Sequence, residues 1–157
     1  MARTRIRQHV NPLSIKYTKP ISLPDWNRIY INANNPLHLD IGCARGKFLI
    51  KMALLYPDIN FLGIEIREAL VVEANENCNH LQLPNLYFLF CNINTHIEEL
   101  LKSFHLGILN CVSIQFPDPW FKRSHQKRRV TQADLVCTIS SNLSSNGHIF
   151  CLLYTSD

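Results

Sequence analysis

Long hydrophobic runs are absent from this sequence of 157 residues. The longest apolar segments, Leu86–Cys91 and Ile149–Tyr154, have six residues each, whereas a membrane-spanning helix needs about 18. The N-terminal letters MARTRIRQHVNP carry charges with no apolar stretch behind them, so we expect no secretory signal peptide. Acidic residues are missing before Asp25, which leaves an organelle transit peptide open. We therefore expect a soluble intracellular protein.

Metal-binding and disulfide patterns are missing as well. The cysteines form no C-x-x-C pair, and no histidine lies at zinc-finger spacing. A disulfide framework is typical of shorter, secreted chains. Several of these cysteines lie inside apolar runs, where cysteine behaves as a small hydrophobic residue. We expect no metal site, and we expect buried free thiols at Cys43, Cys78, Cys91, Cys111, Cys137 and Cys151.

Basic residues gather at two places, although the net charge is only +4. All but the last two acidic residues lie between the two clusters. The first cluster is Arg3, Arg5, Arg7, Lys16 and Lys19, and the second, in the letters KRSHQKRR, is Lys122, Arg123, Lys127, Arg128 and Arg129. Two separate clusters favour a polyanionic partner, because phosphate contacts add and release counterions. Either cluster alone is equally compatible with a solvated charged surface.

The composition is typical of a folded protein, with 46% hydrophobic and 18% charged residues. Its length is close to that of one domain. Pro12, Pro20 and Pro24 block long helices near the N-terminus, so residues 1–35 are predicted to form a basic arm. Residues 36–157 are predicted to form the single domain.

From residue 37 onward, strand and helix patterns alternate. Strands are predicted over 37–41, 60–64, 86–91, 109–116 and 148–154, and helices over 46–56, 67–81, 95–104 and 131–143. Glu98 follows Thr95 by three residues, which predicts a capping box at the third helix. This alternation predicts an α/β fold with a parallel sheet covered by helices on both faces. In such folds the ligand lies outside the carboxyl ends of the strands.

The first predicted strand ends in the letters DIGCARG, residues 40–46. Glycines at a strand-to-helix turn allow a ligand to approach the backbone closely. The spacing of Gly42 and Gly46 excludes a P-loop, and one glycine is missing from the pattern of dinucleotide-binding oxidoreductases. Asp40 would repel a pyrophosphate, but it would suit a cationic or amine-bearing ligand.

Polar residues also follow the next three strands. Glu65 is an acid at the place where carboxylates commonly accept both ribose hydroxyls. Asn92 can donate and accept together, which matches an adenine edge. Asp118 lies between two prolines that keep it out of a helix. Each feature alone has an ordinary structural explanation, but together with Asp40 these residues predict one shared rim.

Three segments carry a resemblance to a known family. The letters DIGCARGKFL, NFLGIEIRE and FPDPWFKRSHQKRRV resemble bacterial-type tRNA (guanine-N7-)-methyltransferases, and RQHVNPLS and LPDW are similar to their cyanobacterial and plastid-lineage branch. The glycine loop is shared with many methyltransferases, whereas the F-P-D-P-W block is highly specific. An amino-group methyltransferase would instead need N/D-P-P-Y after the fourth strand.

The resemblance implies a Rossmann-like class I S-adenosylmethionine-dependent methyltransferase fold. It implies methylation of N7 of guanosine 46 in the variable loop of tRNA, in the cytoplasm or the plastid stroma. Asp40, Gly42, Glu65, Asn92 and Asp118 would bind S-adenosylmethionine, and Asp118 would also be the catalytic carboxylate. The tRNA would be bound by Lys122, Arg123, Lys127, Arg128 and Arg129.

Two departures from the family pattern are visible. Ala44 stands where many members have glycine, and Tyr154 stands where they have an aspartate. The family also continues for several tens of residues, so the resemblance implies a domain without its last strands. A non-catalytic tRNA-binding fragment therefore remains an alternative to the enzyme, and the sequence leaves monomer and homodimer open.

Overall fold

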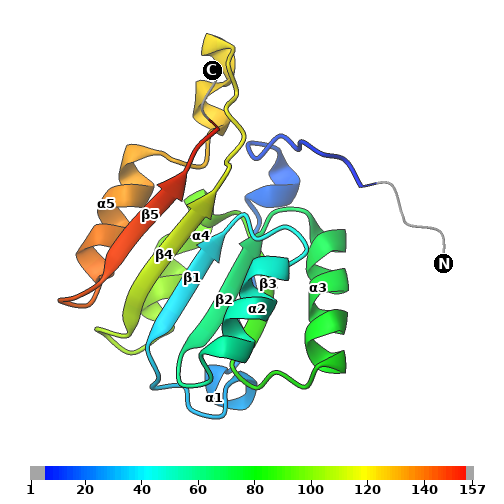
Figure 1. The fold of residues 1–157 in the computed structure, drawn as a ribbon. Helices are drawn as coiled ribbons and strands as arrows, with labels where there is room; N and C mark the ends of the chain where they lie inside the picture. Colours follow the sequence, from blue (N-terminus) through cyan, green and yellow to red (C-terminus); the bar gives the residue numbers. More distant parts are fainter. Residues whose placement is uncertain (1–5, 155–157) are drawn as a thin grey trace.

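The computed structural model describes residues 6–154, so Arg3 and Arg5 of the first basic cluster lie outside the described residues. These residues form a parallel sheet with the strand order β3-β2-β1-β4-β5 (Figure 1). The strands are β1 (Leu37–Ile41), β2 (Asn60–Glu65), β3 (Leu86–Phe90), β4 (Leu109–Gln115) and β5 (His148–Leu152). The predicted parallel α/β fold is confirmed.

Helices cover both faces of this sheet. On one face lie α2 (Lys47–Leu55) and α3 (Glu68–His80); on the other lie the short α1 (Trp26–Ile29), α4 (Ile93–Lys102) and α5 (Ala133–Asn142). Within the described part of the chain, no helix is both long and apolar enough to cross a bilayer.

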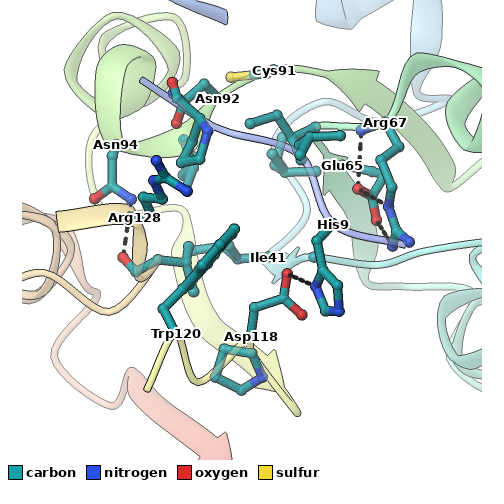
Figure 2. A pocket seen from close by; sticks show the side chains of 18 of the residues that line it. His9, Ile41, Glu65, Arg67, Cys91, Asn92, Asn94, Asp118, Trp120 and Arg128 are labelled. Atoms are coloured by element: carbon teal, nitrogen blue, oxygen red, sulfur yellow. Dashed lines mark hydrogen bonds and ion pairs between the residues drawn. The ribbon is translucent and has the colours of Figure 1, made fainter. Parts of the chain in front are cut away.

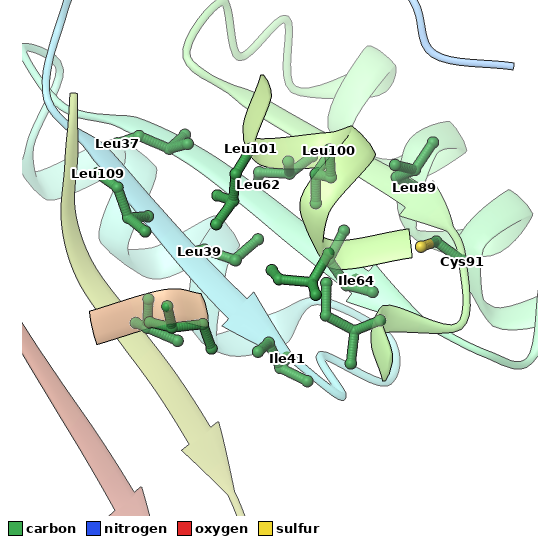
Figure 3. Close-up of a cluster of buried hydrophobic side chains, with 14 of the residues drawn as sticks. Leu37, Leu39, Ile41, Leu62, Ile64, Leu89, Cys91, Leu100, Leu101 and Leu109 are labelled. Atoms are coloured by element: carbon green, nitrogen blue, oxygen red, sulfur yellow. The ribbon is translucent and has the colours of Figure 1, made fainter. Parts of the chain in front are cut away.

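Strand β1 lies in the middle of the sheet and is buried at every position. Leu37, Leu39 and Ile41 point toward the α4 and α5 side, where they join the larger core cluster (Figure 3). Side chains of a strand alternate between its two faces. His38 and Asp40 therefore point the other way, which decides the environment of Asp40 described below.

Three details of the structure differ from the sequence prediction. Helix α4 begins at Ile93, because the carbonyl of Asn92, two residues after the end of β3, accepts the N–H groups of Thr95 and His96. Thr95 thus lies inside the first turn, and no capping box forms.

All six cysteines are free, but Cys137 and Cys151 are exposed instead of buried. Residues Arg123–Arg128, for which the sequence predicts no element, form a short 3-10 helix, η2.

The arm contacts the domain, although no side chain between residues 6 and 25 is buried. It contains a single 3-10 turn, η1 (Ile15–Tyr17), and α1, in agreement with the helix-blocking prolines. Trp26 is buried, and its indole N–H donates to Ser103 Oγ at 2.8 Å. Tyr30 is also buried, and its hydroxyl donates to the carbonyl of Phe61 at 3.0 Å. A domain boundary at residue 35 stays a prediction.

Candidate functional site

A cavity of about 300 Å³ lies at the carboxyl ends of the strands. Three of the four residues predicted to share a rim line it, namely Glu65, Asn92 and Asp118, and Gly42 of the glycine loop lines it too. Gly42, Asn92 and Asp118 follow β1, β3 and β4, and Glu65 is the last residue of β2. The parallel sheet therefore brings Glu65, Asn92 and Asp118, which are far apart in the sequence, to one cavity (Figure 2). The N-terminal arm lines the same cavity with Gln8, His9, Val10 and Pro12. Asp40 is not among the lining residues.

The glycine loop leaves β1 through left-handed backbone conformations. Gly42 has φ +79° and Gly46 has φ +71°, a region that side chains with a Cβ atom rarely adopt. A Cβ atom at Gly46 would also overlap the ring of Phe88. At Gly42 no atom lies within 4 Å of where a Cβ would be, so the cavity side of this residue is open. A ligand can therefore reach the backbone at Gly42.

Glu65 is 2% exposed, and both of its carboxylate oxygens are hydrogen-bonded. Ala44 N–H and Arg67 Nη2 donate to Oε2 at 3.0 and 2.9 Å. Arg67 N–H and Nε donate to Oε1, each at 3.0 Å. The hydrogen bonds to Glu65 raise the pKa of Arg67, so this guanidinium stays charged. Two backbone donors thus fix the carboxylate, and the Arg67 side chain covers it.

Asp40 lies in a buried polar chain on the opposite face of β1. Ser113 Oγ donates to Asp40 Oδ1 at 2.6 Å, and Gln115 Nε2 lies 3.4 Å from the same oxygen. His38 Nε2 lies 2.8 Å from Ser113 Oγ. Burial raises the pKa of Asp40 to about 6, and burial lowers the pKa of His38 to about 4. Gln115 lines the cavity and is the link between Asp40 and that space.

Asp118 lies on a strained loop after β4. Phe116 and Trp120, on either side of the Pro-Asp-Pro segment, have φ values of +51° and +43°. The Asp118 side chain is 43% exposed, and its Oδ2 lies 2.8 Å from His9 Nδ1. Across the cavity, Asn92 Nδ2 donates to the carbonyl of Pro12 at 3.0 Å. Both contacts come from the N-terminal arm.

The second basic cluster divides into two groups. Lys122, Arg123 and Lys127 are exposed on and beside η2. Arg128 lines the cavity with its guanidinium 5.2 Å from the centroid of the Trp120 ring. Arg129 Nε donates to the carbonyl of Pro119 at 2.7 Å, so this side chain supports the Asp118 loop. In the described part of the chain, no three His, Cys, Asp or Glu side chains form a possible metal site.

Comparison with known proteins decides the family. A family model described as "Putative methyltransferase" matches residues 34–153. A tRNA (guanine-N(7)-)-methyltransferase of Microcystis aeruginosa is 57% identical over 150 residues, which cover 96% of this chain and 71% of that protein. The protein of the same name from Synechocystis sp. is 56% identical over 149 residues, covering 95% of this chain and 70% of that protein. This chain belongs to the tRNA (guanine-N7-)-methyltransferase family.

Solved structures of other methyltransferases share the fold. An antibiotic-related methyltransferase superposes with a TM-score of 0.60 at 18% identity, covering 90% of this chain and 70% of that chain. PKMT2 from Rickettsia typhi superposes with a TM-score of 0.58 at 18% identity, covering 76% of this chain and 21% of that chain. These likenesses confirm the Rossmann-like class I methyltransferase fold predicted from the sequence.

Sequence reasoning missed two features of this methyltransferase site. The first is the ion pair between Arg67 and Glu65. Residues two apart in an extended chain share a face, so the sequence spacing could have predicted this pair. The approach of His9 to Asp118 joins residues 109 positions apart, and no local pattern indicates such a contact.

Proposed function

We propose that this chain transfers a methyl group from S-adenosylmethionine to N7 of guanosine 46 in the variable loop of tRNA. Membership of the family supports tRNA (guanine-N7) methylation. The observation that carries the proposal for this chain is the convergence of Gly42, Glu65, Asn92 and Asp118 on one cavity. We further propose that the protein acts where tRNA is modified, in the cytoplasm or the plastid stroma.

The lining residues fit S-adenosylmethionine, the cofactor of this family. The Ala44 and Arg67 N–H groups hold the Glu65 carboxylate in place, and two ribose hydroxyls can replace the donors of the Arg67 side chain. Asn92 offers an amide to the adenine edge. Open space beside Gly42 admits the ligand to the backbone. Asp40 supports the same region through Gln115. When bound, the cofactor supplies a methyl group on a cationic sulfur.

Asp118 is the catalytic carboxylate in this proposal. Guanine N7 carries a free lone pair, so its methylation needs no general base. The reaction moves positive charge onto the purine, and catalysis then comes from alignment and from the electrostatic field. Asp118 accepts hydrogen bonds from the guanine edge and stabilises the purine as it becomes cationic.

The second basic cluster holds the tRNA backbone in this proposal. Lys122, Arg123 and Lys127 are the exposed side chains that reach phosphates, and Arg128 borders the cavity where the guanine enters. Arg129 supports the loop by donating from Nε and Nη2 to the carbonyls of Pro119 and Trp120, and its Nη1 donors are left for the RNA. Arg7 in the arm is exposed and provides a second contact.

The test is the incorporation of tritiated methyl groups into unmodified tRNA by this chain and by Asp118→Ala. We expect the variant to lose at least about a hundredfold in transfer rate, the usual scale for removing a group that stabilises transition-state charge. Its affinity for S-adenosylmethionine, measured by calorimetry, stays within about threefold, since the main cofactor contacts lie on other strands. Asp58→Ala, an exposed aspartate before β2, is the matched control with unchanged rate. Equal loss of transfer and cofactor binding contradicts the assigned role.

The alternative function, a non-catalytic tRNA-binding fragment, gives a different result in the same assay. Such a fragment binds tRNA but incorporates no label, whereas a family-length version with additional C-terminal residues does. Incorporation by the present chain excludes this alternative.

A further inference from the structure

Residues 8–17 of the arm, here named the strap, cross the carboxyl ends of three strands (Figure 1). At the end of each of these strands, the strap contacts a polar side chain. His9 pairs with Asp118 after β4, the Gln8 carbonyl lies 3.4 Å from Arg67 Nη1 after β2, and the Pro12 carbonyl accepts from Asn92 after β3. Farther along, Lys16 Nζ lies 3.7 Å from Glu68 Oε2 at the start of α3. The strap thus contacts the polar groups proposed to hold cofactor and base.

The His9 contact is directed at a single oxygen of Asp118. His9 Nδ1 lies 2.8 Å from Oδ2, a distance at which an Nδ1–H group donates to a carboxylate oxygen. The His9 ring also meets Trp120 edge-on, with 6.0 Å between ring centroids and an interplanar angle of 64°. These two contacts fix both the position and the tilt of the imidazole (Figure 2). Among the described residues, Asp118 Oδ1 has no hydrogen-bond partner.

We infer that His9 is a positioning residue for the methyl-transfer reaction. It holds Oδ2 of Asp118, so that Oδ1 faces the cavity and accepts from the guanine edge. This inference rests on the proposed role of Asp118. The Asp118 side chain is 43% exposed on a loop. Such a carboxylate samples several rotamers unless a hydrogen-bond donor fixes it. The strap carries that donor from a distant part of the sequence.

An opposite reading of the same contact makes the strap an inhibitory cover. In that case His9 competes with guanine for Asp118, and the strap leaves before the base enters. The two readings predict opposite signs for the effect of removing the imidazole. Removal of a positioning residue slows methyl transfer, whereas removal of an inhibitory contact speeds it.

The first experiment is single-turnover methylation of unmodified tRNA with saturating S-adenosylmethionine. We expect His9→Ala to lower the transfer rate about tenfold, the loss that corresponds to one charge-assisted hydrogen bond. His9→Asn places an amide N–H near the Nδ1 position and restores the rate to within about threefold of wild type. Affinity for S-adenosylmethionine is unchanged in both variants. His80→Ala, an exposed histidine at the end of α3, serves as the control. A wild-type or higher rate in His9→Ala overturns the inference.

The second experiment needs no turnover. In protein with ¹⁵N-labelled histidine, nuclear magnetic resonance identifies which ring nitrogen carries the proton. We expect His9 to be protonated at Nδ1 in the wild-type chain and to lose this preference in Asp118→Ala. A His9 that shows the same ring protonation in both proteins overturns the inference. A wild-type chain that transfers no methyl group makes the proposed function fail, while the ring protonation still decides whether His9 holds Asp118.

Discussion

Ala44 is a residue-scale departure from the family pattern, and its backbone carries a cost. It lies between Gly42 and Gly46 with φ +50°, where a Cβ atom is unfavourable by about 1–2 kcal/mol. Its N–H still donates to Glu65 at 3.0 Å, so the strained conformation serves the site. Strain of this kind persists where the surrounding structure requires it.

Ala44→Gly is therefore expected to stabilise the fold. Relief of the left-handed strain outweighs the extra freedom of glycine in the unfolded chain, for a net gain of about 0.5–1 kcal/mol in the free energy of unfolding. Urea denaturation measures the change. Ala69→Gly, an exposed position inside α3, is the control and loses about 1 kcal/mol because its backbone is helical. A loss of stability in Ala44→Gly contradicts this account of the loop.

Asp40 gives a pH-dependent prediction. Burial raises its folded-state pKa from 3.8 to about 6. This residue therefore favours the fold below pH 3.8, and that contribution is lost as the pH rises through about 6. Asp40→Asn keeps an acceptor for Ser113 and never ionises. Relative to wild type, its free energy of unfolding should rise by about 2–3 kcal/mol between pH 4 and pH 7.

Urea denaturation of both proteins at several pH values tests this prediction. His38 titrates in both proteins, so its contribution cancels in the difference. Asp58→Asn, at an exposed site, provides the comparison and shows no such trend. A pH-independent difference between Asp40→Asn and wild type would mean that burial does not raise the pKa of Asp40.

The lining residues Gly42, Glu65, Asn92 and Asp118 could be predicted because each one lies at, or within about three residues of, the carboxyl end of a strand. Asp40 was expected on the same rim, yet Ile41, its neighbour, lines the cavity instead. Alternation along β1 turns the two side chains to opposite faces, and that reasoning was available in the sequence. His9 could not be found, since its position depends on how the whole arm packs.

At the scale of elements, the helix η2 is the basic surface nearest the cavity. Its exposed cations Arg123 and Lys127, and Lys122 directly before it, can each release counterions on binding phosphate. Replacing all three by glutamine should reduce the salt slope of tRNA affinity by roughly two to three and weaken binding at low salt. Filter binding over a range of potassium chloride concentrations measures the slope. A matched control neutralises the exposed Lys47, Lys51 and Lys102, and an equal slope change in both triple variants refutes a local tRNA surface.

The elements themselves were largely predictable because their apolar periodicities differ. Strand β1 begins and ends where the sequence predicts, and α5 covers Ala133–Asn142 within the predicted 131–143. The start of α4 was misplaced because only Cys91 and Asn92 separate β3 from the helix, and Asn92 is already its N-cap. Helix η2 has polar side chains and no buried residue, so no hydrophobic pattern marks it.

For the whole molecule, the parallel sheet explains why a site can form from residues spread over most of the chain. Every strand points its carboxyl end to the same edge, and the strap closes that edge from the N-terminal side. The chain spans 71% of the Microcystis relative, and the described part already contains the polar groups of the proposed cofactor site. The proposed methyl transfer therefore depends on one site that is shared by the cofactor and the guanine base.

A crystal structure of this chain with S-adenosylhomocysteine tests that dependence most directly. We predict the ribose hydroxyls on Glu65, the adenine beside Asn92, and the sulfur facing Asp118, with the Arg67 side chain moved off the Glu65 carboxylate. A ligand bound elsewhere, for example in the groove between Lys16 and α3, or a ribose with no contact to Glu65, would contradict the account.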